Sequence, residues 1–114
     1  MKVLFITLNI LSLIFLSSSL LAEDMKKEGT KTVWIDVRTT EEFNSGHIEG
    51  ALHIPYEKIG EEISKHVQDK NTRIKVYCKV GGRAGIAKKT LDKMGFKNVI
   101  NAGGYKQIIK EMKK

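Results

Sequence analysis

The distribution of apolar positions from residue 32 onward alternates between two periods. Four short apolar runs are bounded by turn-forming or charged residues, and they predict buried strands at 32–36, 50–55, 74–78 and 98–100. Between them, apolar residues recur at gaps of three and four, which predicts amphipathic helices. Because strands and helices alternate and the connections are short, the pattern predicts βα units, an α/β fold and a mostly parallel sheet.

Each expected helix has an apolar face or a recognisable end. Thr39 or Thr40 can cap a short helix that stops at Gly46. Helices over 56–67 and 83–95 follow, and the last helix begins after Gly103-Gly104. The apolar faces of these three helices comprise Tyr56, Ile59, Ile63 and Val67, then Ala84, Ala87, Leu91 and Met94, and finally Ile108, Ile109 and Met112.

Residues 1–22 have a different pattern, in which Lys2 precedes an apolar stretch and a Ser-rich patch leads to Ala22. This is the layout of a secretory signal peptide, and we expect cleavage after Ala22. An uncleaved anchor is the alternative, although the stretch is shorter than the ~20 residues that span a bilayer. Residues 23–31 are charged and aperiodic, which indicates a linker. The sequence thus predicts one domain over 32–114 in a periplasmic or secreted protein, without membrane contact once processed.

Charge and cysteine content narrow the functional classes. Lys and Arg number 20 against 13 Asp and Glu, a net charge of +7 that falls to about +6 when Lys2 is removed with the signal. The charges are scattered and no basic stripe with interleaved aromatics is present, so we do not expect nucleic-acid binding. The single cysteine excludes an intramolecular disulfide. His53 and His66 lack metal-ligand spacing, and we expect neither a metal nor a cofactor.

Three polar or glycine-rich features follow predicted strands, namely Asp36 to Arg38, the loop after Cys78, and Asn101 to Gly104. Parallel strands bring their carboxyl ends to one edge of the sheet, where ligands bind in such folds. We therefore expect the candidate site at this edge, with Cys78 in it.

The residues after Cys78 suit an anion. A cysteine at the end of an apolar strand can be a small buried hydrophobe. Here, however, Gly81 and Gly82 allow a tight turn with inward N–H groups, a helix begins near Arg83, and Lys79 adds a cation. The anion can be the Cys78 thiolate, whose pKa would then be lowered, or a negatively charged substrate.

The length of this loop indicates which anion fits. Cysteine phosphatases place five residues between their cysteine and arginine, whereas four lie between Cys78 and Arg83, and Ala84 follows. The ring of amides would be one residue too small for phosphate, so a persulfide or the terminal sulfur of a small anion is the better fit. A phosphatase or arsenate reductase is accordingly disfavoured.

The loop and its surroundings resemble the rhodanese-like sulfurtransferases. "VYCKVGGRAGIA" is similar to their active-site loop, "WIDVRTTEEFNSGHIEGALHIP" to their N-terminal signature, and "MGFKNVINAGGY" to their last strand and Gly-Gly turn. The resemblance is greatest to small, exported, single-domain members, and it implies a small sheet flanked by helices on both faces. Ile108 and Ile109 occupy the region in which many members have a tryptophan, so the packing of the last helix is open.

The resemblance implies a thiosulfate sulfurtransferase. Cys78 would take the outer sulfur of thiosulfate as a persulfide and pass it to a thiophilic acceptor such as cyanide or a thiol. Separately from the resemblance, we expect a monomer without a cofactor, because a cradled Cys78 thiol disfavours a Cys78–Cys78 dimer. Lys79 and Arg83 suit a dianionic donor, and Gly103 and Gly104 would let the backbone pass close to the loop. The backbone amides expected to bind the substrate sulfur are those of Lys79, Val80, Gly81, Gly82, Arg83 and Ala84.

Other readings stay open at this point. A persulfide carrier, or a module that senses sulfur or redox state, would keep the same cysteine without efficient turnover. Asp36 and Arg38 could support the active site, or Arg38 could form a structural salt bridge with Asp36 or Glu42. His47 is expected to be structural rather than a general base.

Overall fold

The computed structural model describes residues 31–114. The predicted signal peptide (1–22) and all but the last residue of the predicted linker (23–31) lie outside the described residues. Within 31–114, none of the helices has the length and apolar character needed to cross a bilayer.

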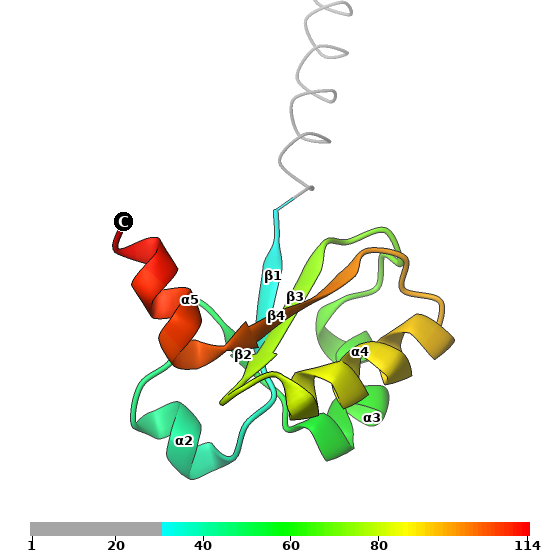
Figure 1. Cartoon of the computed structure of the whole chain (residues 1–114). Helices are drawn as coiled ribbons and strands as arrows, with labels where there is room; N and C mark the ends of the chain where they lie inside the picture. Colours follow the sequence, from blue (N-terminus) through cyan, green and yellow to red (C-terminus); the bar gives the residue numbers. More distant parts are fainter. Residues whose placement is uncertain (1–30) are drawn as a thin grey trace, which may run out of the picture. The chain divides into compact units, whose positions relative to one another are not determined.

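The described residues form an α/β fold around a four-stranded parallel sheet (Figure 1). The strand order is β2-β1-β3-β4, which places β1 and β3 in the centre. A parallel sheet needs crossover connections, and the helices between the strands supply them. The strands are β1 (Val33–Asp36), β2 (Leu52–His53), β3 (Ile74–Cys78) and β4 (Val99–Gly104).

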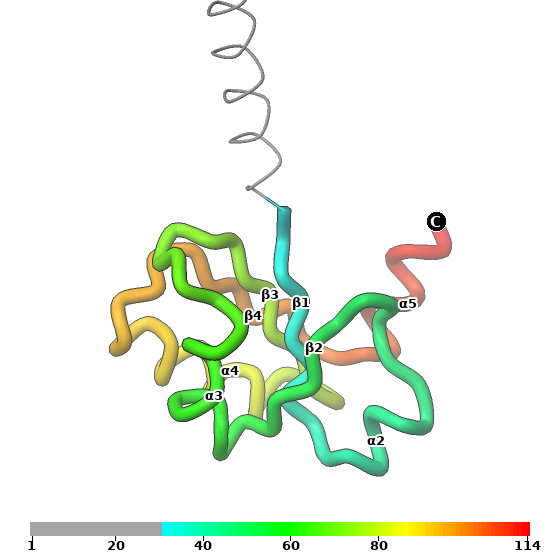
Figure 2. Tube along the Cα trace, turned by 180° about the vertical axis from the view of Figure 1, so that it is seen from behind, coloured from blue at the N-terminus to red at the C-terminus, as the bar shows by residue number. Residues whose placement is uncertain are grey.

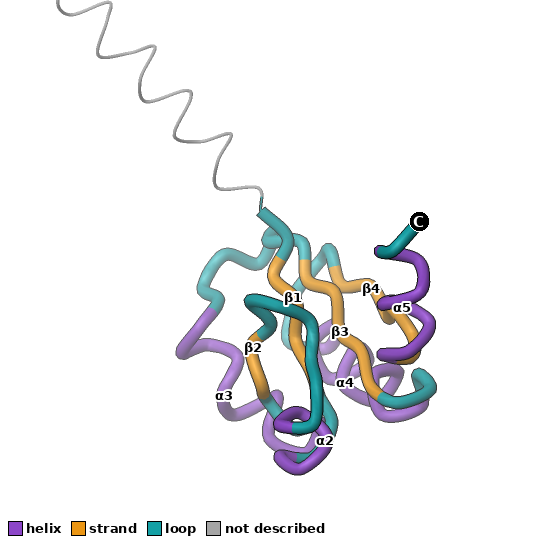
Figure 3. Tube along the Cα trace, turned by 90° about the vertical axis from the view of Figure 1, so that its left-hand side faces the viewer, coloured by secondary structure: helices purple, strands orange, loops and turns teal. Residues whose placement is uncertain are grey.

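Helices cover both faces of the sheet. The 3₁₀ turn η1 leads into α3, which lies with α4 on one face, whereas α5 lies on the other (Figures 2 and 3). The short α2 lies near the carboxyl ends of the strands (Figure 1). The helical elements are α2 (Thr40–Asn44), η1 (Tyr56–Lys58), α3 (Ile59–His66), α4 (Gly82–Lys93) and α5 (Tyr105–Met112).

The alternation of side chains along β3 sets the direction of the cysteine. Ile74, Val76 and Cys78 belong to the larger buried cluster, which includes residues of α3 and α4. Tyr77 belongs to the smaller cluster on the opposite face, with Ile48 and Ile108. Because successive side chains of a strand point to opposite faces, Cys78 points to the α4 side of the sheet.

Most of the predicted helix faces are confirmed. Ile59, Ile63, Val67, Ala84, Ala87, Leu91 and Ile108 are buried, and Tyr56 and Met94 are partly buried against the same core. The prediction was wrong for Met112, which is 54% exposed because it is the last residue of α5. The cap of α2 is Thr39, and the helix predicted over 56–67 begins as the 3₁₀ turn.

Two strands differ in length from the prediction. The strand expected over 50–55 is reduced to Leu52–His53, since Gly50 adopts a turn with φ of 81° and Pro55 has no N–H to donate. The strand expected over 98–100 extends to Gly104. Its register with β3 shifts between Val76 and Tyr77, so β4 carries one extra residue and still pairs Gly104 with Cys78.

The pairing of Gly104 with Cys78 brings β4 against the loop that follows the cysteine. A Cβ atom at Gly104 would overlap the carbonyl oxygen of Lys79 and lie 3.2 Å from the Cα of Val80. Both are backbone atoms, so the loop itself would have to move. The expected close approach at this glycine is therefore confirmed.

We predict that Gly104→Ala lowers the free energy of unfolding by about 1–3 kcal/mol, the usual cost of forcing extra atoms into a packed site. Gly82→Ala is the matched control, because a Cβ at this helical glycine would meet no atom within 4 Å. Urea unfolding of the two variants should show a loss for Gly104→Ala and an unchanged or higher stability for Gly82→Ala. Equal stabilities would contradict the proposed close approach.

Candidate active site

Cys78 lies at the end of β3 with only 1% of its surface exposed. The chain then turns through Gly81 into α4, and the N–H of Gly81 donates a hydrogen bond of 2.9 Å to the Cys78 Sγ. Gly81 has a φ of 111°, a left-handed conformation that favours glycine. Gly82 is already the first residue of α4, so only one of the two adjacent glycines is needed for the turn.

The loop amides set the electrostatics of the thiol. Burial raises the pKa of Cys78, but backbone N–H groups of Ala84, Gly81, Val80 and Arg83 lower it, and the net direction is downward. Four of the six residues predicted to donate amides thus act on this sulfur.

A side chain from β4 braces the loop from the other side. The Nδ2 of Asn101 donates to the carbonyl oxygen of Gly81 at 3.0 Å, and its Oδ1 accepts from the N–H of Gly103 at 2.9 Å. Asn101 therefore connects the turn after Cys78 to the bulged part of β4. The predicted convergence of the two strand ends at one edge is confirmed.

Arg83 is engaged by a carboxylate that the sequence did not single out for the site. Its guanidinium donates to both carboxylate oxygens of Glu42, at 2.7 and 3.0 Å. The hydrogen bonds from Arg83 lower the pKa of Glu42 to about 2, against an opposing effect of burial and with help from Thr39. The ion pair consequently persists at all but strongly acidic pH. The cation assigned to a dianionic donor is already balanced by a negative charge.

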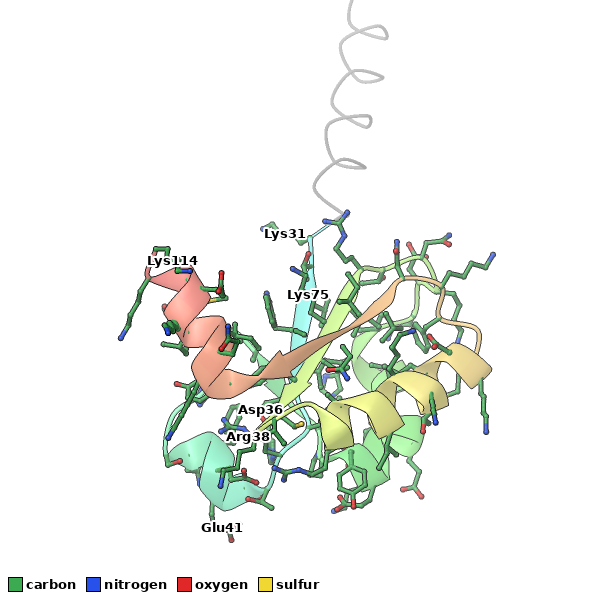
Figure 4. All side chains as sticks on the ribbon, in the orientation of Figure 1. Lys31, Asp36, Arg38, Glu41, Lys75 and Lys114 are labelled. Atoms are coloured by element: carbon green, nitrogen blue, oxygen red, sulfur yellow. The ribbon has the colours of Figure 1, made fainter. Side chains whose placement is uncertain are left out.

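Asp36 and Arg38 form a salt bridge with each other, which was the structural alternative to a direct role in the active site. Arg38 Nε lies 2.9 Å from Asp36 Oδ1 and its Nη2 lies 2.7 Å from Oδ2, in an almost fully buried pair. Arg38 also donates to the carbonyl oxygen of Gly46 at 2.7 Å and lies 4.6 Å from the ring centre of Tyr105. The alternative pairing of Arg38 with Glu42 is not formed. Figure 4 shows Asp36 and Arg38 beside the carboxyl ends of the strands.

The histidines have structural contacts. His47 Nδ1 lies 2.9 Å from the carbonyl oxygen of Phe43, and its ring stacks on the Phe43 ring at 3.7 Å. His53 Nε2 lies 2.8 Å from the carbonyl oxygen of Arg38. Across residues 31–114, no group of three or more His, Cys, Asp or Glu side chains could hold a metal ion.

Two cavities open beside the cysteine loop, and each is lined by one member of the Arg83–Glu42 ion pair. The smaller, of about 230 Å³, is lined by Arg83 together with residues 37–41 and 55–57. The larger, of about 340 Å³, contains Glu42. It is lined by Arg38, Glu42, Ser45, Lys79, Tyr105 and Lys106.

Comparisons with known proteins agree with this geometry. The profile of the rhodanese-like domain matches residues 18–111. Thiosulfate sulfurtransferase PspE of Escherichia coli is 47% identical over 75 residues, which cover 66% of this chain and 72% of PspE. A structure described as rhodanese with anions from E. coli has a TM-score of 0.65 and 45% identity, over 67% of this chain and 89% of that chain.

A relative of another description also matches. The putative sulfur carrier protein YrkF of Bacillus subtilis is 41% identical over 69 residues, which cover 59% of this chain but only 35% of YrkF. The similarity thus extends to one part of a longer protein.

We predict that Cys78 titrates below the value of about 8.5 for a free thiol, since the amide donors favour its thiolate. Thiolate absorbance of the folded protein, with Cys78→Ser as the blank, measures this midpoint. Because Arg83 interacts with the Cys78 charge, removing the Glu42 charge should lower the midpoint further. Glu42→Gln is compared with Glu61→Gln, which removes an exposed carboxylate of α3 that lines neither cavity. A midpoint at or above the free-thiol value, or equal shifts in both variants, would contradict this account.

Proposed function

Since the chain belongs to the family of rhodanese-like domains, we propose that it is a thiosulfate sulfurtransferase that carries the transferred sulfur on Cys78. The observation that carries this proposal is the buried Cys78 sulfur with the Gly81 N–H donating to it from a loop of further amides. Such a loop stabilises sulfur anions and is too short for the phosphate group of a phosphatase substrate.

The first step is a displacement at sulfur. The Cys78 thiolate attacks the outer sulfur of thiosulfate, a new S–S bond forms, and the electron pair of the old S–S bond leaves with sulfite. Cys78 then carries a persulfide, whose terminal sulfur is an anion. The amides of Val80, Gly81, Arg83 and Ala84 are the donors available to hold it.

The second step regenerates the Cys78 thiolate. A thiophilic acceptor attacks the terminal sulfur of the persulfide, and the bonding pair returns to Cys78 as thiolate. Atoms and electrons balance over the two steps, so neither a metal nor a cofactor is required. Sulfite leaves before the acceptor attacks, and Cys78 carries the sulfur between the two half-reactions, so the kinetics are ping-pong.

The ion pair changes the expected roles of the two loop cations. Arg83 and Lys79 were expected to bind the dianionic donor together, but Arg83 is paired with Glu42. We assign Lys79 as the cation that attracts thiosulfate, and Arg83 as a group that orders the loop and favours the thiolate. Asp36 and Arg38 support the site indirectly, through their buried pair at the end of β1.

A persulfide carrier is the second candidate. It is favoured by the near-complete burial of Cys78 and by the similarity to YrkF, which is described as a putative sulfur carrier protein. A carrier would form the persulfide readily and release the sulfur slowly to small acceptors.

We further propose where the protein is located and that it is a monomer. Residues 1–22 would direct export and be removed after Ala22, which leaves a periplasmic or secreted monomer with a single domain over 32–114. The support is the signal-peptide pattern of the sequence. An intact mass that begins at Glu23 in the exported protein, and a monomer mass in solution, are the corresponding measurements.

We predict that the protein forms thiocyanate from thiosulfate and cyanide, and that Cys78→Ser lowers this rate at least about a thousandfold, as expected for loss of a nucleophile. The assay follows thiocyanate over time at matched protein concentrations, with circular dichroism to show that the variant is folded. Mass spectrometry after thiosulfate alone should show one added sulfur in the wild type and none in Cys78→Ser.

The outcomes separate the candidates. Thiocyanate that does not depend on Cys78 would overturn the proposal. Fast persulfide formation with negligible thiocyanate turnover would favour the carrier. Hydrolysis of a phosphate ester by Cys78 would show that the argument from loop length is wrong.

A further inference from the structure

The larger cavity beside the cysteine loop has an unbalanced positive charge. Four of its lining residues are ionisable groups with a formal charge, and two of these are already paired elsewhere. Arg38 is paired with Asp36, and Glu42 is paired with Arg83. Lys79 and Lys106 remain, and neither forms an ion pair with any residue of the described part of the chain, 31–114.

The two lysines are brought together by the sheet. Cys78 is paired with Gly104 across β3 and β4, so the residues that follow each strand emerge at the same edge. Lys79 comes directly after Cys78, and Lys106 is the second residue of α5, which begins directly after β4. Both side chains line one cavity, and Lys79 directly follows the reactive Cys78 in the chain. A cavity with two unpaired cations attracts an anion.

The size of the cavity indicates which substrate it suits. Its volume of about 340 Å³ lies within the range of small-molecule sites, roughly 300–1,000 Å³. Cyanide would leave most of that space empty, whereas a thiol that carries a carboxylate would place its charged end there and its sulfur toward Cys78. No lysine lines the smaller cavity.

We propose that Lys79 and Lys106 form a subsite for the carboxylate of an anionic thiol, which is the acceptor in the second half-reaction. This inference rests on the proposed sulfurtransferase function. The thiol loses its proton to solvent, its thiolate attacks the terminal sulfur of the Cys78 persulfide, and the S–S bond to Cys78 breaks. The products are the thiol's persulfide and the Cys78 thiolate. Lys106 lies outside the loop that holds the sulfur. It would therefore affect which acceptor thiol is preferred and not the chemistry at Cys78, so we class it as a specificity-determining residue.

The test measures the discharge of the persulfide in single turnovers, which separates it from loading by thiosulfate. The acceptors are 3-mercaptopropionate, 2-mercaptoethanol and cysteamine, which carry a negative, no and a positive charge, and rates are compared per thiolate. Lys106→Gln should lower the rate with 3-mercaptopropionate about 1.5- to fivefold relative to 2-mercaptoethanol, the effect expected of one exposed charge pair. Added salt should reduce the preference of the wild type for the anion.

Lys110→Gln is the matched control, because it removes the same charge from the same helix outside the cavity. It should leave the preference for 3-mercaptopropionate unchanged. Equal effects of Lys106→Gln on all three thiols, no effect, or a slower loading by thiosulfate with unchanged discharge would each overturn the subsite. If thiosulfate does not load Cys78, the proposed function fails instead, and loading with inorganic polysulfide still allows the discharge test.

Discussion

The hydrogen bonds from backbone amides to the Cys78 sulfur are the interaction on which the rest of the site depends. A thiol with 1% exposure would normally stay protonated, because burial disfavours the thiolate. The turn at Gly81 directs N–H groups at the sulfur, and together these groups lower the pKa of Cys78 despite its burial. The same donors that stabilise a thiolate can stabilise the terminal sulfur of a persulfide. One loop geometry therefore serves both the nucleophile and the intermediate.

The loop does not maintain this shape alone. Gly104 and Asn101 hold it from the side of β4, where there is no room for a Cβ at Gly104. On the other side, Glu42 of α2 binds Arg83 at the start of α4. The ion pair connects α2 to α4 beside the loop, and its two members line different cavities, Arg83 the smaller and Glu42 the larger. Lys79 and Lys106 then supply the unpaired positive charge of the larger cavity.

The sequence contains the local features of this site but not its long-range pairing. Cys78, Gly81 and the start of α4 are contiguous, so their spacing was enough to predict an anion-binding loop at a strand end. The pairing of Glu42 with Arg83 was missed because the two residues are 41 positions apart, and because a carboxylate after the cap Thr39 already has a local role. The extra residue in β4 was also missed, since a bulge depends on its pairing with β3. The sequence could not show whether Asp36 and Arg38 form a buried structural pair or an exposed pair in the active site, because a single sequence does not reveal how deeply a residue is buried.

The central claim is that the loop after Cys78 holds transferred sulfur among its amides. A crystal structure of the protein reacted with thiosulfate tests it most directly. We expect one additional sulfur atom bonded to the Cys78 Sγ, within hydrogen-bond distance of the N–H groups of the turn and the first residues of α4. An unmodified Cys78, or an added sulfur that points away from these amides into solvent, would contradict the account.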